Sequence, residues 1–207
     1  MGINLNGMLN DYSNGNGAKG ASLNLRKNDV LNLTKRNPGL EEVTLGAGWD
    51  VARNGQDFDL DIAAFLLNGR GQVQNVPEDV IFFNNMKAAG IELLGDNRTG
   101  AGDGDDERIQ MNLKRLAPHV EKIVFVVTIF EATSKRQTFG MVENSFVRLL
   151  DSKNNEKELC IFNLKENGST STAVVFAELY RNSGEWEFKA IGEGKIADLN
   201  GILSLYM

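Results

Sequence analysis

The sequence predicts an all-β protein, an antiparallel β-sandwich with few short helices. Short segments rich in β-branched and aromatic residues recur along the chain, and turn signals separate them. No helices of crossover length alternate with these segments, which argues against a parallel α/β sheet. Only Ile196–Met207 suggests a helix, and Gly201 weakens that prediction.

The predicted strands follow one another from Ser22 onward. They are Ser22–Arg26, Asp29–Lys35, Val43–Asp50, Asp57–Leu67, Val80–Phe83, Arg108–Leu116, Glu121–Phe130, Ser145–Asp151, Lys157–Leu164, Ser171–Tyr180 and Glu185–Gly192. Glu121–Phe130 has the continuous apolar character of a strand buried on both faces, so it should lie centrally. The last two strands flank Arg181–Gly184, a hairpin signal. Gly46 and Gly48 leave room for close approach of another backbone segment.

Composition limits the classes of function. The 207 residues are 42% hydrophobic, which is sufficient for a core, and residues 22–207 are predicted to form one domain. Residues 1–21 are rich in Asn and Gly and are predicted to be a flexible extension. The net charge of −6 argues against a nucleic-acid partner. No apolar run is long enough to span a membrane, and a single cysteine, Cys160, fits a reducing cytoplasm.

The stretch DNRTGAGDGDDE, residues 96–107, carries the strongest chemical signal. Four of its last five residues are carboxylates, and Gly104 lets the backbone fold back so that neighbouring acids can converge. Like charges so close together repel, and a bound cation relieves that repulsion. Dense carboxylate, amide and carbonyl oxygens suit Ca²⁺, which takes about 6–8 oxygen ligands. A calcium site is therefore predicted.

A second acidic segment, DFDLD at residues 57–61, precedes an apolar strand. Period-two alternation puts Asp57, Asp59 and Asp61 on one face and Phe58, Leu60 and Ile62 on the other. Oxygens from both segments are too numerous for one ion, so two neighbouring Ca²⁺ ions are predicted. The predicted ligands are Asp57, Asp59, Asp61, Asn84, Asn85, Asp96, Gly102, Asp103, Gly104, Asp105, Asp106 and Glu107.

Two other metal sites match poorly. Asp96 and Glu107 occupy the first and twelfth places of an EF-hand window, but Arg98 and Gly100 stand at ligand positions and no flanking helices are predicted. The Asp-x-Asp pairs are also typical of Mg²⁺ sites in transferases, which need a phosphate cradle that this sequence lacks. A solvated acidic surface is the alternative to any metal site.

Catalytic chemistry has little support in the sequence. His119 and Cys160 are the only residues of their types, so a Cys/His zinc site is excluded. Cys160 lies in an apolar run, where a buried thiol is expected. Trp49 and Trp186 are expected to pack at strand ends rather than stack on a ligand. No catalytic residue is predicted.

Several signatures together resemble the TerD family of tellurium-resistance and stress-response proteins. They are GAGWD (46–50), QDFDLDIAAFLL (56–67), VIFFNN (80–85), GDNRTGAGDGDDE (95–107), KIVFVVTI (122–129), FVRLLD (146–151) and ELYRNSGEWEFKAIGEG (178–194). The resemblance covers roughly residues 22–195 in the same order. The family usually has a polar pair after VVTI, where this chain has Phe130 and Glu131.

The resemblance implies a calcium-binding antiparallel β-sandwich that acts in stress and tellurite response without catalysis. It also implies partners among other tellurium-resistance and stress proteins, including contact with the inner membrane surface through such a partner. The metal would then order a surface that a partner recognises. The alternative is a metal-dependent module that binds a small ligand, a cyclic nucleotide or a sugar.

Overall fold

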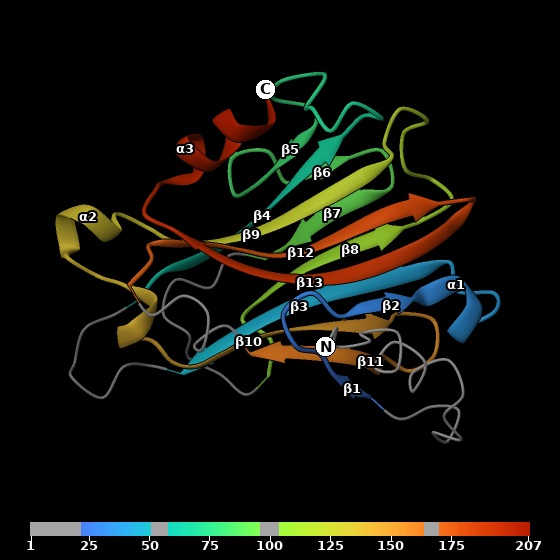
Figure 1. The fold of residues 1–207 in the computed structure, drawn as a ribbon, viewed down its shortest axis with the longest axis horizontal. Helices are drawn as coiled ribbons and strands as arrows, with labels where there is room; N and C mark the ends of the chain where they lie inside the picture. Colours follow the sequence, from blue (N-terminus) through green and yellow to red (C-terminus); the bar gives the residue numbers. More distant parts are fainter. Residues whose placement is uncertain (1–21, 51–57, 96–103, 164–169) are drawn as a thin grey trace, which may run out of the picture.

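The computed structural model describes residues 22–50, 58–95, 104–163 and 170–207, which form a sandwich of two β-sheets (Figure 1). The seven-stranded sheet has the order β1-β11-β10-β3-β8-β7-β6. Its strands are β1 Leu23–Asn24, β3 Glu42–Asp50, β6 Lys87–Ala88, β7 Ile91–Leu94, β8 Glu107–Asn112, β10 Glu143–Asp151 and β11 Lys157–Asn163. All neighbours in this sheet are antiparallel except β1 and β11, which are parallel.

The six-stranded sheet has the order β2-β13-β12-β9-β4-β5 and is antiparallel throughout. Its strands are β2 Val30–Asn32, β4 Leu60–Leu67, β5 Val80–Ile81, β9 Lys122–Ile129, β12 Ala173–Asn182 and β13 Glu185–Lys195. The predicted antiparallel β-sandwich is therefore confirmed. So is the central place of β9, whose residues from Ile123 to Ile129 are all buried.

The main core lies between the sheets and is built by strand alternation. Val43, Leu45 and Ala47 of β3 face the other sheet, where Phe125 and Phe176 stack with ring centroids 5.9 Å apart. A second apolar cluster covers the outer face of the six-stranded sheet. There the C-terminal segment packs on β4, with the Phe65 and Tyr206 rings 5.8 Å apart.

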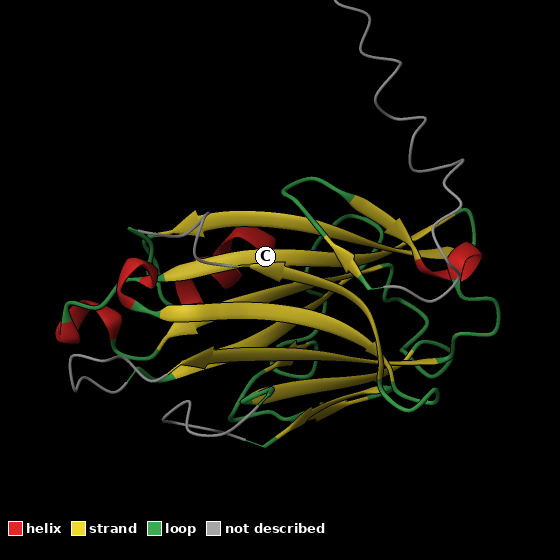
Figure 2. Cartoon of the chain, turned by 90° about the horizontal axis from the view of Figure 1, so that it is seen from below, coloured by secondary structure: helices red, strands yellow, loops and turns green. Residues whose placement is uncertain are grey.

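The helices are short, as predicted. They are α1 Leu33–Arg36, α2 Ala132–Lys135, η2 Phe139–Met141, α3 Leu199–Leu203 and η3 Ser204–Tyr206. Helices α1 and α2 lie at opposite ends of the molecule, and red helical turns are visible at both ends in Figure 2. The expected C-terminal helix forms as α3 and η3, and the Asp198 carboxylate caps it by accepting the Gly201 N–H at 2.8 Å.

Local polar contacts explain where the elements differ from prediction. The strand expected over Asp29–Lys35 ends at Asn32, because the Asn32 side chain accepts the Lys35 N–H at 2.8 Å and begins α1. The strand expected over Arg108–Leu116 ends at Asn112, whose side-chain oxygen accepts the N–H groups of Lys114 and Arg115 at 3.1 Å. Strands β6 and β7 and helix α2 were not predicted, since each is only two to four residues long.

Candidate metal site

The two acidic segments meet at one end of the sandwich. Asp59 directly precedes β4, and Gly104–Asp106 directly precedes β8. The Glu107 carboxylate accepts the Ile62 N–H at 2.7 Å and so joins β8 of one sheet to β4 of the other. Glu107 is only 1% exposed. Strand β5 is only two residues long, so it does not reach the Ile62 N–H of β4. Glu107 supplies the acceptor for that N–H inside the core.

The segment from Gly104 rests on β3 because β3 has two glycines on that face. A β-carbon on Gly48 would lie 2.6 Å from the Gly104 carbonyl oxygen, and one on Gly46 would overlap the Asp105 carboxyl group. Any larger residue at either place would push the segment away. The predicted close approach of another backbone segment is therefore confirmed at Gly48, whereas at Gly46 the close neighbour is a side chain.

Asp105 is held on the outer face of the seven-stranded sheet by two arginines. Its Oδ1 accepts Arg148 Nε at 2.7 Å, and its Oδ2 lies 3.6 Å from Arg108 Nε. The Asp105 side chain is 4% exposed. The bond to Asp105 is the largest contribution to the raised pKa of Arg148. Asp105 therefore already has cationic neighbours and fixes the segment to the sheet.

Asp106 is bound to the backbone of β3. Its N–H donates to the Ala47 carbonyl at 2.8 Å, and its Oδ2 accepts the Trp49 N–H at 2.9 Å. Burial raises the pKa of Asp106, and the negative charges of Asp105 and Asp50 raise it further, while the Trp49 N–H opposes the shift. A cation at this carboxylate would relieve both the desolvation and the repulsion.

Asp50 was not among the predicted ligands. It ends β3, is exposed, and accepts a hydrogen bond from the Asn144 side chain. Its charge acts on Asp106. The sequence held a signal for it: Asp50 closes the GAGWD segment, and alternation along that strand places it on the face of Gly46 and Gly48.

The alternation predicted for the DFDLD segment is confirmed where it is described. Leu60 and Ile62 face the core between the sheets, while Asp61 lies opposite Thr128 with the outer-face set of β4. Asp61 is 9% exposed. Asp61 and Asp105 are thus on the outer faces of different sheets. The Asp59 carbonyl accepts the Phe130 N–H at 2.8 Å, which ties the start of β4 to the end of β9.

Asn84 and Asn85 form the turn after β5. The Asn85 amide donates to the carbonyls of Pro77 and Val80, both at 2.8 Å, and Asn84 is exposed. No hydrogen bond within the described ranges joins either residue to the acidic segments. The other predicted ligands, Asp57, Asp96, Gly102 and Asp103, lie outside the described residues. Among the residues that are described, no group of three or more His, Cys, Asp or Glu side chains is arranged to hold a metal ion.

The residues weighed for catalysis have structural contacts. His119 Nε2 lies 2.9 Å from Asp79 Oδ1, and Asp79 also accepts the Asn75 N–H at 2.9 Å. Cys160 is buried, as predicted, and burial raises the pKa of its thiol to about 12. Trp49 and Trp186 are buried as expected, at 3% and 9% exposure. No helix within the described part of the chain is both long and apolar enough to cross a membrane.

Comparison with known proteins places these features in a family. The family model of the TerD domain matches residues 21–206. The chain is 43% identical to tellurium resistance protein TerD of Serratia marcescens, with 89% of this chain and 97% of the relative covered. It is also 43% identical to general stress protein 16U of Bacillus subtilis (strain 168), with the same coverage of both chains.

A solved structure supports the fold. The crystal structure of a homologue of telluride resistance protein (TerD) from Streptomyces coelicolor A3(2) superposes with a TM-score of 0.64. The two chains are 26% identical, and the match covers 78% of this chain and 94% of that one.

Proposed function

Because this chain belongs to the TerD family, we propose that it is a calcium-binding stress-response protein associated with tellurite resistance. In this proposal Ca²⁺ orders the acidic end of the sandwich into a surface that a partner protein recognises, and the protein catalyses no reaction. Other tellurium-resistance and stress proteins in the cytoplasm are the proposed partners, and any contact with the inner membrane surface is through them.

The environment of Asp106 is the observation that carries the proposal. Its carboxylate is partly desolvated beside two further carboxylates, Asp50 and Asp105, so the pKa of Asp106 is raised. The Gly104 carbonyl lies over Gly48, the residue before Trp49, whose N–H the Asp106 carboxylate accepts. Carboxylate and carbonyl oxygens are the donors that Ca²⁺ prefers. Bound calcium would supply positive charge and fix the geometry of the segment.

The described acids divide into two groups by their contacts. Asp105 and Glu107 are engaged by Arg148 and the Ile62 N–H, so we assign them to anchoring the segment on the two sheets. Asp106 and Asp50, with the Gly104 carbonyl, would hold an ion together with oxygens from the predicted ligands outside the described residues. Asp59 and Asp61 are the candidates for a second ion near the start of β4.

The properties of Cys160 and His119 support the proposal that the protein catalyses no reaction. A thiol with a pKa of about 12 is almost entirely protonated at neutral pH, so Cys160 is a poor nucleophile and a poor reductant for a tellurium oxyanion. His119 is paired with Asp79, and no hydrogen bond within the described ranges joins its imidazole to the Cys160 thiol, which contacts the Leu149 backbone instead.

Calcium titration by calorimetry tests this function. We expect the wild-type protein to bind Ca²⁺ and to gain thermal stability well beyond the gain in equal Mg²⁺. Asp106→Asn should lose most of this effect. Asp198→Asn is a matched control, because it removes the same charge while Asn still caps α3. Equal stabilisation by both metals, or equal binding by Asp106→Asn and wild type, would refute the proposal.

A further inference from the structure

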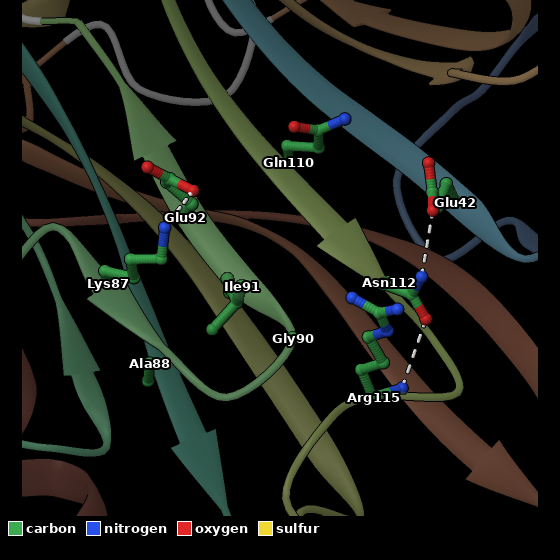
Figure 3. A pocket seen from close by; sticks show the side chains of 9 residues that line it. All are labelled: Glu42, Lys87, Ala88, Gly90, Ile91, Glu92, Gln110, Asn112 and Arg115. Carbon is green, nitrogen blue, oxygen red and sulfur yellow. Dashed lines mark hydrogen bonds and ion pairs between the residues drawn. The ribbon is translucent and has the colours of Figure 1, made fainter.

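A second candidate site lies on the outer face of the seven-stranded sheet, away from the acidic end. A hollow of about 260 Å³ opens between the β6–β7 hairpin and the residues that follow β8 (Figure 3). Asn112 of β8 pairs with Glu42 of β3 there, whereas Glu107 pairs with Ala47 at the metal end. The hollow and the acidic segment are thus at opposite ends of β8, about 17 Å apart at the rise of an extended strand.

Three of the four charged side chains around the hollow already have partners. Lys87 Nζ lies 2.8 Å from Glu92 Oε2. Glu42 accepts Asn112 Nδ2 at 2.9 Å and lies 3.5 Å from Lys153. The two carboxylates of the hollow are therefore balanced by neighbouring donors.

Arg115 is the fourth charged residue of the hollow. Its guanidinium makes no ion pair or hydrogen bond with the described residues, and Figure 3 draws its only dashed line from the backbone N–H to Asn112. The side-chain amide of Gln110 also has no hydrogen bond within the described ranges. A free guanidinium fork and a free amide therefore face the same hollow.

The backbone holds Arg115 in a fixed place. Gly90 has a φ of +75°, and a β-carbon there would lie 2.5 Å from the Arg115 carbonyl carbon. The Asn112 N–H donates to the Gly90 carbonyl at 2.8 Å, and the Asn112 side chain accepts the Arg115 N–H. The hairpin and the segment carrying Arg115 are thus locked together, so the backbone needs little ordering to bind a ligand and only the exposed Arg115 side chain must be fixed.

The chemistry of the walls selects the ligand. A guanidinium binds a carboxylate through two parallel hydrogen bonds. Glu42 and Glu92 are already paired, so the hollow has one uncompensated positive charge, which matches a monocarboxylate better than a doubly charged anion such as phosphate. The Ile91 side chain is 3% exposed and packs in the main core, so half-buried Ala88 is the apolar side chain that a methyl group of the ligand can contact. Gln110 can pair with an amide or hydroxyl group.

We propose that this hollow binds a small monocarboxylate with a short aliphatic body and an amide or hydroxyl group, anchored by Arg115. The carboxylate can belong to a free metabolite or to the C-terminus of a peptide, since both present the same groups. The site requires no calcium, so it is independent of the function proposed above.

NMR titration of ¹⁵N-labelled protein in EGTA tests the proposal. The probes are N-acetyl-alanine, its amide, which lacks the carboxylate, inorganic phosphate, and a tetrapeptide ending in alanine. We expect saturable shifts of the Gln110 side-chain, Ile91 and Arg115 signals with N-acetyl-alanine, and none with its amide or with phosphate. Much tighter binding of the tetrapeptide would assign the site to a peptide C-terminus, and equal binding would assign it to a small molecule.

Two variants make the test specific. Arg115→Gln should weaken binding by about tenfold or more, the effect of losing one charge-assisted bidentate contact. Arg70→Gln removes the same charge from an exposed turn elsewhere and should leave binding unchanged. Absence of saturable shifts with both carboxylate probes, or equal binding by Arg115→Gln and wild type, would overturn the proposal. Calcium binding by the same samples reports separately on the metal site.

Discussion

Gly46 lies directly beneath the carboxyl group of Asp105, and a β-carbon at Gly46 would overlap that group. The relationship joins a central strand to the segment that carries the acids at this end of the sandwich. It also explains the glycine at position 46. Leu45 and Ala47 point into the core, so residue 46 points to the outer face of the sheet, where Asp105 leaves no room for a side chain.

Gly46→Ala should therefore loosen the acidic segment. We expect a loss of about 1–3 kcal/mol in the free energy of unfolding, the usual effect of overpacking a tight site. Calcium affinity should fall as well, because Asp106 follows Asp105 directly. Urea denaturation measures the first effect and calorimetry the second. Gly69→Ala is the control, since its nearest neighbour would be the Glu121 Cγ at 3.9 Å. Equal stability of the two variants would contradict this account.

Arg148 and Asp105 should be energetically coupled. Arg148→Gln leaves the nearly buried Asp105 carboxylate with only Arg108, so it should destabilise more than the double variant with Asp105→Asn. We expect a coupling of about 1–2 kcal/mol, reduced from a fully buried pair because the Arg148 side chain is 29% exposed. A double-mutant cycle in urea measures it, and additive losses would argue against coupling.

Asp106 should make the metal-free protein less stable as pH rises. Its folded-state pKa is raised, so the folded chain holds this proton more tightly than the unfolded chain does. The contribution of this group is therefore largest at low pH and falls as pH rises from 3.8 through the folded-state value. In EGTA near neutral pH, Asp106→Asn should unfold at the same temperature as wild type or higher.

Calcium should reverse that order. At a hundredfold excess over its dissociation constant, a ligand that binds only the folded state stabilises it by about 2.7 kcal/mol. Wild type should then exceed Asp106→Asn. Scanning calorimetry of both proteins, with EGTA or with calcium and over a pH series, measures both effects. A variant that is less stable than wild type in EGTA would show that the Asp106 charge is not destabilising.

Replacing Asp79 should destabilise the fold more than replacing its partner His119. Asp79 is 3% exposed and accepts hydrogen bonds from Asn75 and His119, so Asp79→Ala leaves several donors without their acceptor. We expect a loss of about 2–3 kcal/mol, against about 1 kcal/mol for His119→Ala. Urea denaturation of both variants measures the difference. Equal losses would mean that Asp79 acts only through His119.

Cys160 should be nearly inert in the native protein. Its pKa of about 12 and its burial leave little thiolate and no access at pH 8. A disulfide reagent such as Ellman's should react slowly with folded protein and rapidly in urea. Fast, stoichiometric reaction of the native protein would remove one support for a non-catalytic role.

The sequence predicted the elements whose residues follow a recognisable local pattern. Alternation placed Leu60 and Ile62 in the core, continuous apolar character identified β9 as central, and the Arg181–Gly184 signal identified the last hairpin. Strands β6 and β7 were missed because elements of two to four residues are too short to show a period. The parallel pairing of β1 with β11 depends on contacts between distant segments, which no local pattern encodes.

The candidate site was predicted by residue type more than by arrangement. That Glu107 would be buried against the Ile62 N–H, and Asp105 held by Arg148, depends on which face each residue occupies once β8 pairs with β3. Asp50 was overlooked because a single acid at a strand end resembles ordinary surface. The hollow around Arg115 could not be predicted from the sequence, since its walls come from four separate strands and two turns.

The pairing of the first strands carries a consequence for biosynthesis. Strand β1 pairs with β11, and β2 pairs with β13, so neither sheet is complete until strands far along the chain have been synthesised. Folding should therefore be slow, as expected where contacts join distant positions. Until those pairs form, the apolar strands are exposed to aggregation.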